Sequence, residues 1–349
     1  MAAEVRLRAL DPRRDRRLLE RLWDAALGPG WPVLPGGLDI VRDGLVAERR
    51  RGPGAAGGSR GPGPGGGSGG PGASGGLSGP GPAGGSGEHG SGEHRSGEHG
   101  SGGPEGVGVV AVDPGGSIQL LLVDPAHQHR GVGTRLLAAG LERLGVLGAG
   151  MVGLGGGGDD YIWPGVPDDL PAAVGFFAAQ GWRFDHTVID LTTDLRGYRA
   201  PAGIGERPAR AGVTIEVMAE RDRAEVLAFE AATFPEWVGW FERLGASVLV
   251  ARDSSGAVVG TLLFRGPPGA TIYTPLLGAD AGTIGCVGVA AAARGTGVGS
   301  AMVARASELL RDGGTGVCHI SWTSRERFYT RLGYVPWRRY HMARRPVPG

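Results

Sequence analysis

The glycine-rich stretch Arg294-Gly295-Thr296-Gly297-Val298-Gly299 is followed directly by the helical pattern SAMVARASELL. The apolar run TIGCVGV at 283–289 precedes it and is typical of a buried strand. A turn of this kind brings free backbone N–H groups to the positive end of a helix dipole. Its glycines let the backbone approach a large anion closely. The stretch therefore predicts a cradle for a pyrophosphate between a strand and a helix.

The same arrangement occurs a second time, earlier in the chain. Gln128-His129-Arg130-Gly131-Val132-Gly133 follows the strand-like SIQLLLV and precedes the helical TRLLAAGLERL. Both copies fit [Gln/Arg]-x-x-Gly-x-Gly. The spacing differs from the dinucleotide fingerprint, and a chain without lysine cannot supply a nucleoside triphosphate loop. The repeat predicts two copies of one cofactor-binding unit.

An aromatic segment follows each copy in the same order. It reads FYTRLGY at 328–334 and FFAAQGW at 176–182. With these motifs the chain resembles the GNAT superfamily of acetyl-coenzyme A-dependent N-acyltransferases, and specifically its tandem two-domain members. The resemblance implies an α/β (α+β) fold of two tandem GNAT-like domains, each a mixed, splayed β-sheet flanked by helices.

The order of apolar and polar segments predicts the domain boundaries. We expect an N-terminal domain at 1–198, a linker at 199–211 and a C-terminal domain at 212–349. Helices are expected at 14–27 and 38–44, and the strand TVIDLTTDL at 187–195 is expected to close the first domain. Residues 52–106 consist mainly of Gly, Pro and Ser, which predicts a disordered insert inside a β-hairpin.

Composition narrows the class of protein. The formal charge of +1, with all 36 basic residues arginine, gives no surplus to attract nucleic acid. No apolar run is long enough for a membrane span or a signal core, so we expect a cytoplasmic protein. Cys286 and Cys318 are expected to be buried free thiols. No metal is expected, although His89, His94 and His99 in the insert leave a weak metal site as an alternative.

The resemblance also implies which residues bind acetyl-coenzyme A as a cosubstrate. Backbone groups of Val287 and Val289, or Leu122 and Val123 in the first copy, would pair with the pantetheine arm where the sheet splays. The pyrophosphate would be received by Arg294, Gly295, Gly297 and Gly299 in the second copy and by Gln128, Arg130, Gly131 and Gly133 in the first.

The two copies differ where catalysis is decided. In this superfamily a tyrosine of the aromatic segment commonly protonates the departing thiolate, and this position holds Tyr329 in the second copy but Phe177 in the first. The C-terminal domain is therefore expected to be the catalytic one, with Tyr329 as the proton donor. The base stays open, because the strand at 283–289 has no carboxylate and the candidates Glu230, Glu236 and His319 are each also readable as structural.

These features predict an N-acetyltransferase that acts on the amine of a small molecule by direct attack. An acceptor pocket is expected at the aromatic residues Phe234, Trp237, Trp240, Trp337 and Tyr340. The segment 161–169 and the tandem layout are similar to enzymes of amino-sugar metabolism and to the mycothiol synthase family, which suggests an amino sugar or its conjugate as acceptor. The alternatives are a non-catalytic acyl-coenzyme A sensor and a protein N-acetyltransferase. The oligomeric state is left open.

Overall fold

The computed structural model describes residues 5–32, 38–50, 104–156, 161–243 and 245–347. The predicted disorder of 52–106 and the three insert histidines therefore fall almost entirely outside the described residues. The strands on either side of the insert, β2 (Asp43–Arg49) and β3 (Glu105–Asp113), are hydrogen-bonded neighbours in one sheet. The residues between these two strands therefore connect neighbours in one sheet.

The first half of the chain contains short strands around three helices. The helices are α1 (Arg16–Leu27), α2 (Val132–Val146) and α3 (Pro171–Ala179). The remaining strands are β1 (Val5–Ala9), β4 (Ser117–Val123), β5 (Met151–Leu154), β6 (Val166–Pro167) and β7 (His186–Asp194).

The second half repeats this order. Its helices are α4 (Glu206–Arg210), α5 (Arg223–Thr233), α6 (Val238–Glu242), α7 (Thr274–Leu277), α8 (Val298–Asp312) and α9 (Glu326–Thr330). Its strands are β8 (Thr214–Val217), β9 (Ser247–Arg252), β10 (Val258–Arg265), β11 (Ala281–Val289), β12 (Val317–Thr323), β13 (Val335–Met342) and β14 (Arg344–Pro346).

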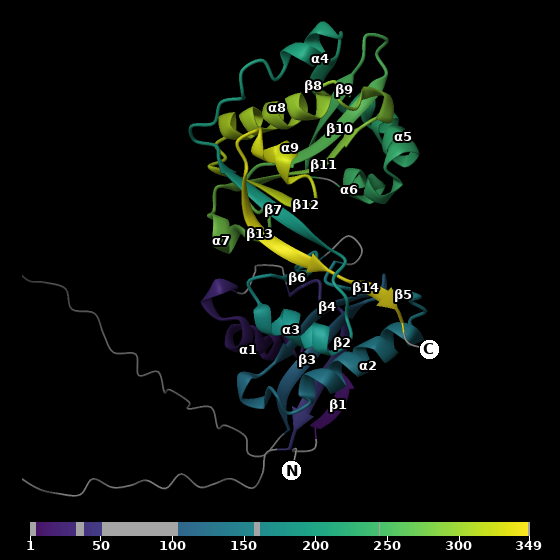
Figure 1. Ribbon diagram of the computed structural model, residues 1–349, viewed down its shortest axis with the longest axis vertical. Coiled ribbons are helices and arrows are strands. Elements are labelled where there is room, and N and C mark those ends of the chain that lie inside the picture. Colours follow the sequence, from purple (N-terminus) through teal and green to yellow (C-terminus); the bar gives the residue numbers. More distant parts are fainter. Residues whose placement is uncertain (1–4, 33–37, 51–103, 157–160, 244, 348–349) are drawn as a thin grey trace, which may run out of the picture. The chain divides into compact units, whose positions relative to one another are not determined.

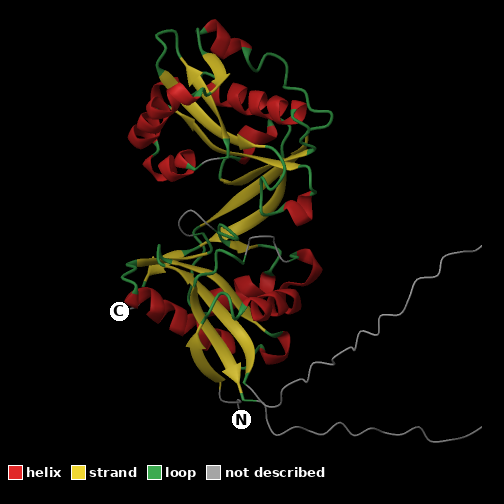
Figure 2. Ribbon diagram, turned by 180° about the vertical axis from the view of Figure 1, so that it is seen from behind, coloured by secondary structure: helices red, strands yellow, loops and turns green. Residues whose placement is uncertain are grey.

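Two mixed sheets organise these elements (Figures 1 and 2). One has the order β1-β2-β3-β4-β5-β14, and the other has the order β6-β13-β7-β12-β11-β10-β9-β8. Each sheet contains both parallel and antiparallel pairs: β4 and β5 are parallel in the first and β11 and β12 in the second, while β1 with β2, β3 with β4 and β10 with β11 are antiparallel. The predicted mixed α/β architecture is confirmed.

The strand β7 corrects one prediction. It was expected to close the first domain, but it hydrogen-bonds to β12 on one side and to β13 on the other. Its apolar side chains Ile189 and Leu191 lie in the core beneath α8, which explains why it joins the second sheet. Conversely, the strand β14, which belongs to the second half of the chain, pairs with β5 of the first sheet. The boundaries 1–198, 199–211 and 212–349 stay a prediction.

Helices cover both faces of the second sheet, with α8 on one face and α5 on the other (Figure 1). The α8 face buries Val298, Met302 and Leu310 against Leu262, Ile284 and Ile320. The α5 face forms a smaller core that contains Val226, Phe241, Val248, Val250 and Leu263. Burying such apolar area is the main stabilising term of a domain of this kind.

Two local predictions were wrong. The segment 38–44 was expected to be a helix, but 38–40 is a turn and β2 already begins at Asp43. The helix α7 in the connection between β10 and β11 was not expected. Its neighbour Tyr273 packs into the aromatic core of the first half, so tertiary contacts fix this segment. No helix in the described ranges is long and apolar enough to cross a bilayer.

Candidate active site

Both glycine turns form the start of a helix as predicted. Gly297 precedes α8 with φ of 97°, and Gly131 precedes α2 with φ of 77°; both angles lie in the left-handed region that favours glycine. The first helical hydrogen bonds are Ala301 N to Gly297 O and Arg135 N to Gly131 O, each 3.0 Å. The N–H groups ahead of these bonds have no partner within the helix, which creates an anion site.

The repeat extends to side-chain contacts. Arg294 Nε donates to the carbonyl oxygen of Val289 at 3.0 Å, and Gln128 Nε2 donates to that of Val123 at 3.1 Å. These bonds fasten each turn to the end of the preceding strand. Part of the role of Arg294 and Gln128 is therefore to shape the cradle. The predicted residues Gly295 and Arg130 lie in the same two turns.

The last glycine of each turn lies against an aromatic ring. A Cβ atom at Gly299 would lie 3.3 Å from Val289 Cγ2 and 3.6 Å from Phe328 Cζ. A Cβ at Gly133 would lie 3.3 Å from Phe176 Cε2. Such spacing leaves little room for any larger residue. The glycine thus lets the aromatic segment approach the helix start in both copies.

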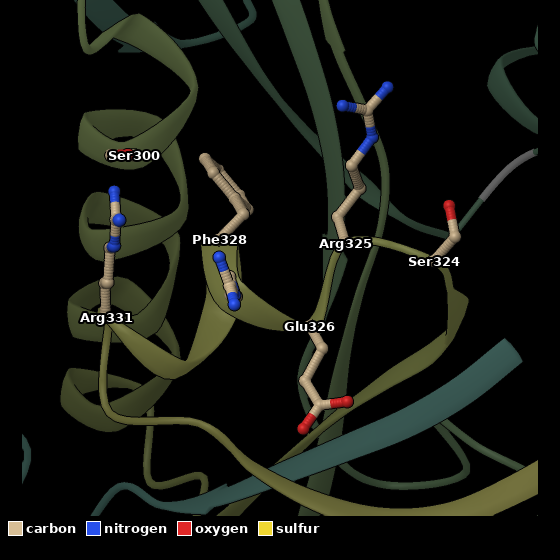
Figure 3. Close-up of a pocket in the computed structure, with 7 residues that line it drawn as sticks. Ser300, Ser324, Arg325, Glu326, Phe328 and Arg331 are labelled. Atoms are coloured by element: carbon tan, nitrogen blue, oxygen red, sulfur yellow. The ribbon is translucent and has the colours of Figure 1, made fainter.

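A cleft of about 680 Å³ opens beside the start of α8 (Figure 3). It is lined by Ser300 of α8 and by the segment that follows β12: Ser324, Arg325, Glu326, Arg327, Phe328 and Arg331. Glu326 forms an ion pair with Arg339 at 3.3 Å. No described carboxylate pairs with Arg325, Arg327 or Arg331. Three uncompensated guanidinium groups next to a helix N-terminus favour a ligand with several phosphates.

A ligand-binding role for these three arginines was not predicted from the sequence. A signal was present, because SRERFYTR places three arginines around the aromatic motif. Arginine-rich segments are common on surfaces, however, and only the fold brings this one to the start of α8.

The second sheet splays beside the cradle. The rungs between β11 and β12 run only from Ala281–Val317 to Ile284–Ile320. The antiparallel partner β10 changes register between Thr261 and Leu263, which leaves an extra residue in β11. Cys286 at this bulge has φ of 47°, an unusual value for a residue other than glycine. The predicted contact residue Val287 therefore lies where the strands part.

The first sheet splays similarly, since β4 and β5 pair only at Ser117–Gly153 and Ile118–Leu154. There the predicted contact residues Leu122 and Val123 pair with β3, opposite Val109 and Gly108.

Tyr329 lies on α9 and is 7% exposed. Its ring packs edge-on against Phe328 at 4.8 Å. Burial raises the pKa of Tyr329, nearby Cys286 acts in the same direction, and Arg325 opposes it. Its hydroxyl has no hydrogen bond to another described residue. A buried, protonated phenol beside the bulge of β11 is able to donate a proton there.

A pair of aromatic residues from distant parts of the chain also belongs to the surroundings of Cys286. The half-buried Tyr161 packs edge-on against Trp322, with 6.5 Å between ring centroids. Burial raises the pKa of Tyr161, hydrogen bonds with Ser321 and Trp322 oppose the rise, and Cys286 adds to it. Trp322 is 45% exposed. The sequence singled out the segment 161–169, but it did not predict the contact of Tyr161 with Trp322, because β12 and residue 161 meet only through the fold.

The predicted aromatic pocket divides into two parts. Phe234 and Trp237 are stacked at 4.8 Å, and the half-buried Trp240 lies beneath Arg243 at 4.5 Å. Tyr340 was expected to line the pocket, but it is fully buried and donates a hydrogen bond to Asp190 at 2.9 Å. Its pocket role was therefore wrong. Trp337 packs against Tyr273 and lines a separate cleft of about 420 Å³ with Asp168, Asp169, Pro336, Arg338 and Arg339.

The corresponding face of the first half is filled with aromatic side chains. Trp163 stacks on Trp23 at 5.3 Å and meets Trp31 edge-on at the same distance. Tyr273 joins this core and donates a hydrogen bond to the carbonyl oxygen of Ile162 at 2.6 Å. Phe177, which replaces tyrosine in this copy, is buried with Trp182. These aromatic side chains form a closely packed core in the first half.

Metal ligands do not gather in the described part of the chain. No group of three or more His, Cys, Asp or Glu residues lies close enough there to hold an ion. Cys318 is buried and Cys286 half-buried, and both are free thiols, as the sequence predicted.

Comparisons with known proteins agree with this geometry. Residues 244–336 match the family model of the acetyltransferase (GNAT) domain. Two curated relatives are mycothiol acetyltransferases. The one from Clavibacter sepedonicus is 31% identical over 228 residues, which is 60% of this chain and 66% of that protein. The one from Clavibacter michiganensis subsp. michiganensis is 30% identical, over 59% of this chain and 64% of that protein. The match thus spans just under two thirds of either relative.

Among solved structures, one similar protein is the GCN5-related glucosamine N-acetyltransferase region of a fungal multi-domain GH3 β-N-acetylglucosaminidase. It aligns with 99% of this chain and 38% of its own, with a TM-score of 0.75 and 26% identity. A tandem GNAT protein from the clavulanic acid biosynthesis pathway aligns over 99% of both chains, with a TM-score of 0.57 and 15% identity. The second likeness concerns the fold alone.

Proposed function

We propose that this chain, which carries a GNAT acetyltransferase domain at residues 244–336, transfers acetyl from acetyl-coenzyme A to the amine of a small molecule. One observation carries the proposal: the second half combines an anion cradle, an arginine-lined cleft and a buried Tyr329 around one pair of parting strands. The pyrophosphate of acetyl-coenzyme A would bind to the N–H groups ahead of α8. The third phosphate of the cofactor would bind in the arginine-lined cleft.

The chemistry follows from this placement. The pantetheine arm would enter between β11 and β12 and bring the thioester to the bulge at Cys286 and Val287. The acceptor nitrogen attacks the carbonyl carbon, and the C–S bond breaks as the tetrahedral intermediate collapses. Tyr329 then supplies the proton that the departing thiolate needs. Holding the two reactants in place supplies much of the remaining rate enhancement.

The first half is proposed to support the second half without transferring acetyl itself. Its glycine turn has the same backbone geometry, so it is able to hold a cofactor. It lacks the tyrosine, and aromatic side chains fill its acceptor face. Strand β7, which it contributes, is also an integral part of the second sheet.

An amino sugar, or a conjugate of one, is the proposed acceptor class. The similar proteins named as mycothiol acetyltransferases and as a glucosamine N-acetyltransferase support this class. The exposed ring of Trp322 and the hydroxyl of Tyr161 also suit it, because aromatic faces pack against sugar rings while polar groups orient their hydroxyls.

The test is a panel of acceptors incubated with acetyl-coenzyme A and the full chain. We expect amine-dependent release of free thiol with glucosamine or related amino sugars, and N-acetyl product by mass spectrometry. Acetyl-coenzyme A binding without thiol release from any amine would favour the sensing module. Activity confined to peptides would favour a protein acetyltransferase.

The arginine-lined cleft leads to a separate prediction about the affinity for acetyl-coenzyme A. The double variant Arg327→Ala/Arg331→Ala should weaken acetyl-coenzyme A binding about five- to tenfold and leave kcat nearly unchanged, because exposed charges contribute modestly and are screened by salt. Calorimetric titration at two salt concentrations measures this, and the salt dependence should fall in the variant. Arg344→Ala, an exposed arginine on β14, serves as the control. Equal affinity in the double variant and the wild type would contradict the assignment.

Tyr161 provides a prediction about the acceptor. Tyr161→Ala removes a ring that contacts Trp322, so the KM for the acceptor should rise about tenfold while acetyl-coenzyme A affinity stays the same. Tyr161→Phe keeps the ring contact and should show a smaller rise. Steady-state kinetics with the acceptor varied at saturating acetyl-coenzyme A measures both. An unchanged acceptor KM in Tyr161→Ala would remove this residue from the pocket.

A further inference from the structure

Glu230 on α5 is a fully buried carboxyl group in the C-terminal domain. The hydroxyl of Thr261 on β10 donates a hydrogen bond to its Oε1. Its other oxygen, Oε2, is enclosed and has no hydrogen-bond partner among the described residues. Enclosing an unpaired carboxylate oxygen is costly, so an arrangement of this kind calls for an explanation.

The surroundings of Glu230 connect it to the parting strands. The groups that face it from neighbouring elements are Thr261 of β10, Glu236 of the turn after α5, and Cys286 at the bulge of β11. Burial raises the pKa of Cys286 to about 12, with Glu230 and Glu236 adding to the rise. Cys286 in turn raises the pKa of Tyr329. Thr261, which donates to Glu230, pairs with Gly288 at the edge of the same bulge, so Glu230 lies beside β11 where its register with β10 changes.

The protonation of Glu230 suits proton exchange near neutral pH. Burial raises its pKa from 4.5 to about 7, the Thr261 hydroxyl opposes the rise, and the Glu236 charge adds to it. A carboxyl group of this kind is partly ionised at neutral pH and can accept a proton and release it again.

The other two candidate bases have different surroundings. His319 is buried with its Nε2 3.2 Å from Asp190 Oδ2, and its ring packs edge-on against those of Tyr273 and Trp337. Its contacts tie it to the packing of β7 and β12. Glu236 is exposed. Among the three, only Glu230 combines enclosure with an unpaired oxygen beside the bulge.

We infer that Glu230 is the terminal acceptor of the proton that the acceptor amine loses, taking the place of the carboxylate that β11 lacks. This inference rests on the proposed function. Glu230 is enclosed and does not contact the amine, so in this scheme the proton reaches it through water at the bulge of β11, beside the half-buried Cys286.

The protons balance in this scheme. An ammonium acceptor carries three protons on nitrogen. The first passes to the Glu230 carboxylate and later to solvent, which leaves the amine free to attack. The second leaves nitrogen as the amide forms and restores the phenol of Tyr329, which has protonated the thiolate. The third stays on the amide nitrogen.

The experiment is the pH dependence of kcat/KM for the acceptor in four proteins: wild type, Glu230→Gln, Thr261→Val and Glu236→Gln. The wild-type rate should fall as the pH drops through about 7, because protonated Glu230 cannot accept a proton. Glu230→Gln should lose about 100-fold near neutral pH and lose this titration step, and the loss should shrink at high pH, where the solution already supplies the neutral amine. Protonation of the acceptor amine in solution contributes the same pH dependence to all four proteins, so differences between their profiles come from the protein.

The two neighbours should move the midpoint in opposite directions. Thr261→Val removes a donor that favours the carboxylate, so the midpoint rises; Glu236→Gln removes a repelling charge, so it falls. A purely structural Glu230 would change the melting temperature and leave the midpoints alike in all active proteins, which would overturn the inference.

A second readout does not depend on knowing the acceptor. Infrared difference spectroscopy of the wild type against Glu230→Gln reports the Glu230 carboxyl directly during a pH titration. A midpoint near 7 that rises in Thr261→Val supports the inference, and a midpoint near the ordinary 4.5 overturns it. If the spectroscopic result holds but no amine is acetylated, the proposed function fails, and the assignment of a proton-accepting role to Glu230 fails with it.

Discussion

Replacing Tyr329 with phenylalanine lowers kcat about 100-fold and changes the affinity for acetyl-coenzyme A by less than about twofold. The ring stays, so its packing against Phe328 and Tyr334 is retained. Only the hydroxyl disappears, and that hydroxyl has no hydrogen bond to another described residue that the fold would lose. The expected effect therefore falls on turnover, because a poorly protonated thiolate leaves slowly.

Tyr334→Phe is the matched control for this experiment. Tyr334 belongs to the same aromatic motif, and its hydroxyl shares a buried hydrogen bond with Ser307 at 2.7 Å. Its loss should lower the free energy of unfolding by about 1 kcal/mol and leave kcat unchanged. Stopped-flow or steady-state thiol release, together with calorimetric titration, separates the two effects. Turnover by Tyr329→Phe equal to that of the wild type would exclude the phenol from the reaction.

Replacing Gly297 with aspartate weakens acetyl-coenzyme A binding by about 100-fold or more, which corresponds to ~2.8 kcal/mol. The new carboxylate caps the N–H groups ahead of α8 and repels a pyrophosphate. The surrounding atoms leave room for the side chain, because a Cβ at Gly297 has its nearest neighbour, Pro208 Cδ, at 3.6 Å; the backbone strain at φ of 97° is matched by that of the Gly131 variant at φ of 77°. Aspartate also tolerates the left-handed backbone better than most residues, and a capping aspartate favours the helix.

Gly131→Asp places the same change at the start of α2, where a Cβ meets nothing within 4 Å. Turnover should survive in this variant, because the first half is proposed to have no transferase site. Calorimetric titration of both variants also reports whether the first cradle binds a second acetyl-coenzyme A. Loss of turnover in Gly131→Asp with retention in Gly297→Asp would reverse the roles of the two halves.

The backbone of the site was predictable because it is local. Strand, glycine turn and helix are adjacent in sequence, so the pattern around Gly131 and Gly297 was sufficient to predict both cradles. The contacts of Arg294 and Gln128 with the preceding strands were not predicted, because their side chains were expected to face the ligand. The residue types at these positions could not distinguish a side chain that contacts the ligand from one that contacts the preceding strand.

The features that were not predicted depend on pairing between segments far apart in the sequence. The alternating strand at 187–195 was recognised as a strand, but periodicity cannot say which sheet it joins, and β7 pairs with β12 and β13. The meeting of Tyr161 with Trp322 depends on the same arrangement. Glu230 was one of three candidate bases, and only burial, Thr261 and the bulge at Cys286 distinguish it from the others.

Acetyl transfer by the second half is tested by following thiol and product together in three proteins. Wild type, Gly131→Asp and Gly297→Asp are each given acetyl-coenzyme A and glucosamine, and thiol release and N-acetyl product are counted in the same sample. We predict equal amounts of thiol and product from the wild type and Gly131→Asp, and neither from Gly297→Asp. Tight binding of acetyl-coenzyme A by the wild type without amine-dependent product from any small amine would contradict the account.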